Sequence, residues 1–129
     1  MRLLLDTHIW LWSLIEPDRL GSSTRSHLRD ANNELWLSPI STWEALTLHG
    51  KGRVYLAADI EEWIARNTAP FREAPLTHEI SFAARQLPLV QRDPADRFLA
   101  ATAKVLDLTL LTADVKLLGL GEISTLANR

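Results

Sequence analysis

Short runs of apolar residues alternate along the chain with stretches in which apolar residues recur at helical spacing. Three of these runs, residues 3–5, 35–37 and 108–111, contain little or no polar alternation, which is typical of strands covered on both faces. Residues 71–76 are a weaker candidate, because Pro75 limits them to a sheet edge or a strand end. Ile123 and its neighbours predict a last short strand.

Helical patterns fill the intervals between these runs. We expect helices over residues 9–15, 22–31, 41–50, 59–67, 77–87 and 93–106. Pro94 fits the first helical position of the longest one, whose apolar face includes Leu99, Ala100 and Ala103. A short helix should begin at Val115. This order predicts an α/β fold, a three-layer sandwich with a mostly parallel central sheet of four to five strands.

Composition limits the class of protein. The chain has 129 residues, 47% of them hydrophobic and 23% charged, which predicts one globular domain over residues 1–129 and excludes intrinsic disorder. The absence of cysteine excludes disulfides, thiolate nucleophiles and cysteine-based zinc sites. No uncharged stretch is long enough for a transmembrane helix, and no small-residue cleavage site follows the apolar start. We therefore expect a cytoplasmic protein without a membrane partner.

The net charge of −2 leaves room for an acidic site in a mildly basic surface. If four of the 16 acidic residues surround a cation, the other acids leave the 14 basic residues in a surplus of two. Eleven of the basic residues are arginines, whose planar guanidinium suits bidentate contacts with phosphate or carboxylate. The alternative, which composition alone favours, is ordinary surface arginine.

Four acidic residues occupy equivalent positions relative to the predicted elements. Asp6 directly follows the first strand, and Asp114 lies three residues after the strand that ends at Leu111. Glu44 and Asp96 lie in the first turns of two predicted helices. Ligands of an open parallel sheet bind in the crevice at the carboxyl ends of the strands. We therefore expect the four acids to meet there, although successive ones are separated by about 40, 50 and 20 residues along the chain.

Carboxylates gathered in one crevice raise each other's pKa unless a cation stabilises their charge. Oxygen ligands, without cysteine and without histidine at ligand spacing, favour a hard cation, Mg²⁺ or Mn²⁺. Such a metal ion activates water and stabilises the charge of an in-line phosphoryl displacement. The four acids therefore predict metal-dependent phosphodiester hydrolysis.

Helix capping is the alternative explanation for these acids. Ser41 and Glu44 have the spacing of a capping box, and Asp93 precedes its helix as a cap would. Asp6 and Asp114 could likewise cap the helices that follow them. A cap needs only an acceptor, however, and Ser, Thr or Asn would serve as well. Four acids at one end of the sheet therefore favour the metal site.

Other residues near these acids are weaker candidates. Thr7 and Thr112 stand close to two of them and could bind a metal-bound water or a phosphate, or complete turns. Arg97 adjoins a third acid and could pair with a carboxylate or a phosphate, or belong to a structural helix face. Trp43 flanks the fourth and could stack a base, although packing in the core or a dimer interface is the commoner role of tryptophan.

Four segments of the chain, in order, resemble those of PIN-domain nucleases, and especially of the VapC-type toxins of type II toxin–antitoxin systems. The opening LLLDTHIWLW contains Asp6, and SPISTWEA followed by GKGRV contains Glu44. The segment DPADRFLAATA contains Asp96, and LTLLTAD ends at Asp114. The segments lie between residues 3 and 114, so the resemblance extends over nearly the whole chain.

The resemblance implies a PIN-like fold and an endoribonuclease that hydrolyses RNA with Mg²⁺ or Mn²⁺. It identifies the catalytic, metal-binding acids as Asp6, Glu44, Asp96 and Asp114, with Asp93 as a helix cap or an outer residue of the site. It also implies a small antitoxin protein that covers the active crevice, and a homodimer.

Two other functions fit part of the pattern. One is a non-catalytic PIN-like domain that binds RNA or protein without cutting. The other is a receiver-type phosphorylation module, which shares the α/β layout and an acidic pocket at the strand ends. A receiver would need a phosphoacceptor aspartate at the end of a central strand, but the second strand here is followed by Ser38 and Pro39.

Overall fold

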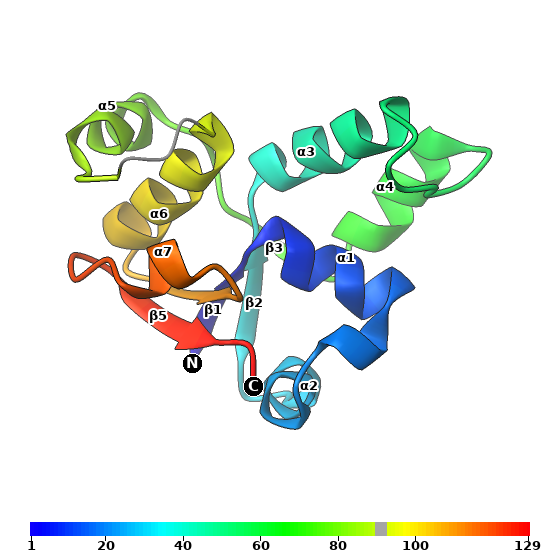
Figure 1. Cartoon of the computed structure of the whole chain (residues 1–129), viewed down its shortest axis with the longest axis horizontal. Helices are drawn as coiled ribbons and strands as arrows, with labels where there is room; N and C mark the ends of the chain where they lie inside the picture. Colours follow the sequence, from blue (N-terminus) through cyan, green and yellow to red (C-terminus); the bar gives the residue numbers. More distant parts are fainter. Residues whose placement is uncertain (90–92) are drawn as a thin grey trace.

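The computed structural model describes residues 1–89 and 93–129, and its centre is a five-stranded sheet (Figure 1). All strand pairs are parallel and the strand order is β3-β2-β1-β4-β5. The strands are β1 (Arg2–Leu5), β2 (Glu34–Leu37), β3 (Arg72–Glu73), β4 (Thr109–Thr112) and β5 (Ser124–Ala127). The predicted parallel α/β sheet is thus confirmed, and the segment containing Pro75 forms only a two-residue edge strand, as proline requires.

Helices occupy the intervals between the strands. They are α1 (Thr7–Ile15), the 3₁₀ helix η1 (Pro17–Arg19), α2 (Ser22–Arg29), α3 (Pro39–Gly50), α4 (Ile60–Thr68), α5 (His78–Gln86), α6 (Pro94–Leu106) and α7 (Val115–Leu118). The expected start of α3 at Ser41 is wrong. The hydroxyl of Ser38 caps this helix, and Pro39 occupies its first position, so that α3 begins two residues earlier.

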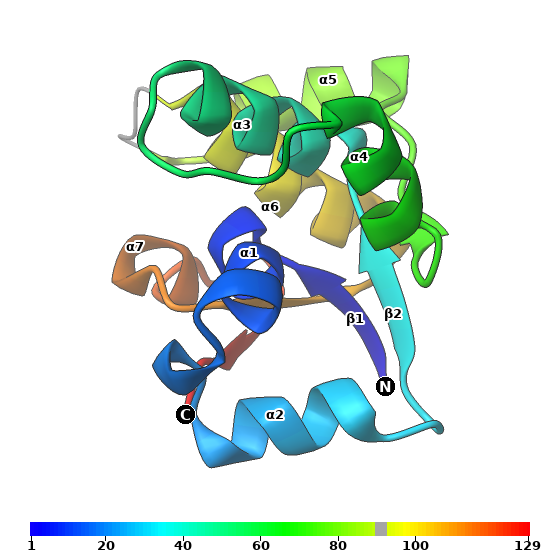
Figure 2. The same cartoon turned by 90° about the vertical axis from the view of Figure 1, so that its right-hand side faces the viewer.

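The central strands are buried on both faces, and each face has its own core. Leu4 and Leu110 pack with α5 and α6, whereas Leu3, Leu5 and Leu111 pack with α1 and neighbouring helices. The two views show these helices on opposite sides of the strands (Figures 1 and 2). Successive side chains of a strand point to opposite faces, so an unbroken leucine run serves both cores. This explains why the strands of the centre contain no polar alternation.

The order of the strands creates a switch point beside β1. The chain leaves β1 for β2 on one side, whereas β4 pairs with β1 on the other side. The carboxyl ends of β1 and β4 therefore lie between crossovers that run to opposite halves of the sheet, which is where ligands of doubly wound folds bind.

Within the described residues, no helix is long and apolar enough to cross a membrane.

The two-sided core makes a direct prediction about stability. Leu110 is completely buried, whereas Leu14, on α1, is 42% exposed. Leu110→Ala should lower the free energy of unfolding by about 2–5 kcal/mol, because it removes buried methyl groups and leaves a cavity. Leu14→Ala, the matched control, should change it by about 0.5 kcal/mol or less. Urea denaturation measures both, and equal effects would contradict the assignment of the core.

Candidate active site

Asp6 lies at the switch point, directly after β1, and is only 6% exposed. Its backbone N–H donates to the carbonyl of Leu111, 3.0 Å away, and the Thr112 hydroxyl donates to its Oδ2 at 2.6 Å. Asp6 occupies the N-cap position of α1, but its side chain makes no capping hydrogen bond. The capping explanation therefore fails for this residue, and its carboxylate is held by the neighbouring strand instead.

Asp114 follows β4 and caps α7, as the alternative explanation from the sequence suggested. Its Oδ1 accepts a hydrogen bond from the backbone N–H of Lys116, 2.9 Å away, at the start of α7. Its own N–H donates to the Thr112 hydroxyl at 3.0 Å. Because Thr112 also donates to Asp6, one hydroxyl connects the two acids that follow the paired strands β1 and β4.

Glu44 is oriented by hydroxyl groups. The predicted capping box of Ser41 and Glu44 is wrong, since Ser38 caps α3 and Glu44 lies beyond its first turn. Glu44 Oε1 instead accepts a hydrogen bond from Thr7. The Thr7 oxygen lies 2.8 Å from the Ser41 hydroxyl, and both residues are buried. A hydroxyl carries one proton, so Ser41 can donate to Thr7 while Thr7 donates to Glu44.

The start of α6 places two further acids. Asp93 caps the helix, because its Oδ1 accepts from the N–H of Ala95 at 3.0 Å, which confirms that expectation. Asp96 follows in the first turn and is half-buried. Arg97 has a structural role, one of the alternatives that the sequence left open. Its guanidinium donates to backbone carbonyls at and beyond the end of α5, those of Ala84, Leu87 and Leu89, and so joins α5 to α6.

These acids share one cavity of about 370 Å³. It is lined by the four predicted acids and by Asp93, Ala113, His8, Trp12 and Arg19. The last three were missed by the sequence analysis. The signal that could have found two of them is helical spacing, since His8 and Trp12 stand four residues apart on the helix that begins directly after Asp6.

Burial and mutual repulsion change the acidity of these groups. Burial raises the pKa of Asp6, and the hydrogen bond from Thr112 only partly offsets this. Burial likewise raises the pKa of Glu44 to about 7, with further repulsion from neighbouring carboxylates. Burial raises the pKa of Asp96 to about 7 as well. Repulsion from four neighbouring carboxylates adds to this rise, and Asp6 contributes the most of the four. The cavity therefore favours any cation that enters it.

The donor set fits a hydrated hard cation better than a fully protein-bound one. Over residues 1–89 and 93–129, no three acidic or histidine side chains are arranged to coordinate a single ion together. Mg²⁺ keeps several waters and commonly takes only one or two carboxylates directly, with substrate phosphate as a further ligand. Carboxylates whose pKa is raised by burial and by one another, around a cavity with space for water, match that mode of binding.

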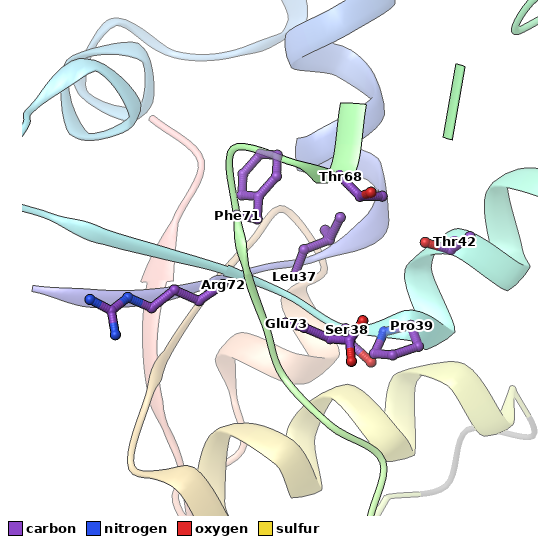
Figure 3. Close-up of a pocket in the computed structure, with 8 residues that line it drawn as sticks. All are labelled: Leu37, Ser38, Pro39, Thr42, Thr68, Phe71, Arg72 and Glu73. Carbon is purple, nitrogen blue, oxygen red and sulfur yellow. The ribbon is translucent and has the colours of Figure 1, made fainter. Parts of the chain in front are cut away.

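A second cavity, of about 310 Å³, lies at the edge of the sheet near the ends of β2 and β3 (Figure 3). Two of its hydroxyl groups are engaged within the protein. The hydroxyl of Ser38 caps α3, and that of Thr68 donates to the carbonyl of Ile64. The Arg72 side chain points away from Glu73 (Figure 3). Its guanidinium lies 3.8 Å from a carboxylate oxygen of Glu34 and over the ring of Trp36. This cavity lies away from the switch point, so the acidic cavity is the candidate active site.

An all-parallel α/β sheet with carboxylates collected at its switch point defines a class of proteins that bind a ligand at the carboxyl edge of the sheet. Residues 3–122 match the PIN domain family model, and the chain belongs to this family. The chain is 32% identical over 115 residues to Ribonuclease VapC22 of Mycobacterium tuberculosis, covering 88% of each protein. The family assignment excludes the receiver-type alternative.

Solved structures of VapBC complexes share the fold. The chain matches VapBC of Salmonella typhimurium, in a DNA-bound crystal structure, with a TM-score of 0.76 at 12% identity, covering 100% of this chain and 99% of that one. It matches VapBC2 of Rickettsia felis, bound to a promoter DNA fragment, with a TM-score of 0.73 at 16% identity over 98% of both chains.

The raised pKa values predict how stability depends on pH without metal. Folding holds a proton on Asp96 up to a pKa of about 7, against an ordinary value of 3.8, so stability is lost as pH rises through this window. In EDTA at pH 8, Asp96→Asn should therefore have a higher Tm than the wild type, by about 4 °C for each kcal/mol of repulsion relieved. The difference should shrink at pH 5. Thermal unfolding followed by circular dichroism measures it, and a lower Tm for the variant at pH 8 would contradict the electrostatic argument.

Proposed function

We propose that the protein is a metal-dependent endoribonuclease, the toxin of a toxin–antitoxin pair, which hydrolyses phosphodiester bonds of RNA in the cytoplasm. The observation that carries the proposal is the single cavity at the switch point into which Asp6, Glu44, Asp96 and Asp114 converge. Membership of the PIN domain family and 32% sequence identity to a protein named as a ribonuclease support the same reaction.

The four acids would hold Mg²⁺ or Mn²⁺ in the cavity, one or two of them directly and the others through bound water. Such an ion, when bound, makes water a stronger nucleophile and stabilises charge on the phosphate. The protein's own contribution is orientation. Thr112 fixes the carboxylate of Asp6, and Thr7, supported by Ser41, fixes that of Glu44. Asp96 is half-buried without a capping role, which leaves it to face the cavity.

The partners we propose are RNA, an antitoxin protein and a second copy of the chain. The solved structures that share the fold include several described as toxin–antitoxin or VapBC complexes, which supports an antitoxin that covers the cavity. Leu14 and Ile15, exposed near the end of α1, could contribute to a protein interface. Trp10 cannot, because it is fully buried.

Catalysis should depend on individual carboxylates. Asp6→Asn and Asp96→Asn should each lower metal-dependent RNA cleavage by about 100-fold or more, as expected for loss of a catalytic group. Asp93→Asn makes the same chemical change in the same cavity, but Asn caps a helix as well as Asp does, so its loss should stay below about tenfold. Cleavage of a labelled RNA in Mg²⁺, with circular dichroism to verify folding, compares the three variants.

Removal of the metal is an independent test. EDTA should abolish cleavage by the wild type, and excess Mg²⁺ or Mn²⁺ should restore it. Cleavage that persists in EDTA, or full activity of both Asp6→Asn and Asp96→Asn, would overturn the proposed mechanism. RNA binding without cleavage under every metal condition would favour the alternative of a non-catalytic PIN-like domain.

A further inference from the structure

The acidic cavity has one wall that is aromatic and cationic. His8 and Trp12 lie on α1, with ring centroids 5.8 Å apart, and Arg19 ends η1 with its guanidinium carbon 4.3 Å from the centroid of the Trp12 ring. All three side chains line the cavity that contains the carboxylates. We call these three residues the Trp12 wall.

The Trp12 wall also lines a neighbouring cavity of about 180 Å³. Most of the other residues around that cavity are apolar, and Arg53 adds a second guanidinium. The volume is several times the share of about 30 Å³ that one water occupies in the liquid. Two spaces of different chemistry therefore share the same wall: one is acidic and suited to a metal ion, and the other is mostly apolar and bordered by arginine.

We propose that the Trp12 wall is a nucleotide subsite, where an unpaired RNA base next to the cleaved phosphate stacks on the Trp12–Arg19 pair and enters the apolar cavity. This inference rests on the proposed function. Base stacking on aromatic rings and on guanidinium planes is how proteins bind single-stranded RNA, because every base has a π face. A base that stacks here must be unpaired, so the subsite selects single strands and loops over duplex.

Charge supports the same assignment. Five carboxylates line the acidic cavity and repel a phosphate backbone, and among the described lining residues Arg19 is the only lysine or arginine. Arg19 is available to a ligand because its ion pair with Glu16 spans 3.9 Å between side chains that are both more than half exposed. Such exposed pairs stabilise little. Arg19 can therefore contact a phosphate that flanks the base.

The other tryptophans have different surroundings. Trp10 is buried and its ring packs 5.5 Å from that of Trp63, while Trp36 lies beneath the guanidinium groups of Arg2 and Arg72. Trp43 is 59% exposed and flanks Glu44, but it is not among the residues that line either cavity. Trp43 is therefore a matched control for Trp12.

Binding of a fluorescein-labelled single-stranded RNA, followed by anisotropy in Mg²⁺, tests the subsite. All proteins carry Asp96→Asn, so that the RNA stays intact. Added Trp12→Leu should weaken binding by about tenfold, the loss of one base–aromatic stack, with an unchanged salt dependence. Trp12→Phe should restore most of the affinity. Arg19→Gln should instead reduce the slope of log affinity against log salt by about 0.7, the loss of one phosphate contact on a single strand.

Controls separate this inference from the proposed function. Trp43→Leu and Arg66→Gln, both at exposed positions outside the two cavities, should bind RNA with the same affinity as the parent.

If RNA is neither bound by the parent nor cleaved by the protein with Asp96 intact, the proposed function is wrong and the subsite is wrong with it. If RNA is cleaved and bound but Trp12→Leu and Arg19→Gln bind it unchanged, the subsite alone is wrong. If those variants lose only the binding of the antitoxin, the wall is a protein-docking surface and the proposal is overturned. If Trp12→Leu does not fold, the salt dependence of RNA binding by Arg19→Gln still tests the subsite, because Arg19 is exposed.

Discussion

Repulsion between carboxylates at the carboxyl edge of the sheet is the constraint on which the rest of the structure depends. The apolar strands β1 and β4 are buried between two layers of helices. Their pairing brings Asp6 close to Asp114 although the two carboxylates repel each other. Burial then makes the negative charges of Asp6, Glu44 and Asp96 costly and raises the pKa of each. The stability of the apolar core therefore sustains a site that is unfavourable by itself, a common feature of active sites.

Buried hydroxyls make this arrangement tolerable. Thr112 and Thr7 donate to carboxylates without adding a charge, and each donation lowers the pKa that burial raises. A lysine or arginine in their place would neutralise the acids and remove the attraction for a metal ion. Hydroxyls hold the carboxylates in place while preserving the negative potential of the cavity, which explains why Thr7, Ser41 and Thr112 are fully buried although they are polar.

The sequence predicted the strands well, because a continuous leucine run is typical of a strand buried on both faces at the centre of a parallel sheet. It predicted the four acids as a group for the same reason, since the carboxyl ends of parallel strands share an edge. It misjudged the start of α3, because Ser41 and Glu44 have capping-box spacing while Ser38 and Pro39 supply the cap three residues earlier. The structural role of Arg97 was left open as an alternative, but its partners were not predictable, since these backbone carbonyls become its neighbours only when α5 packs against α6.

Capping and metal binding, first treated as alternatives, are compatible in this fold. Asp93 caps its helix with Oδ1 and still lines the acidic cavity. The N-termini of α1 and α6 lie beside the carboxylates, and each carries about half a positive charge from aligned peptide dipoles. These partial charges reduce the repulsion without occupying the cavity. An acid at a helix start can thus cap the helix and still line the cavity, as Asp93 and Asp114 do, so the two roles do not exclude each other at this edge of the sheet.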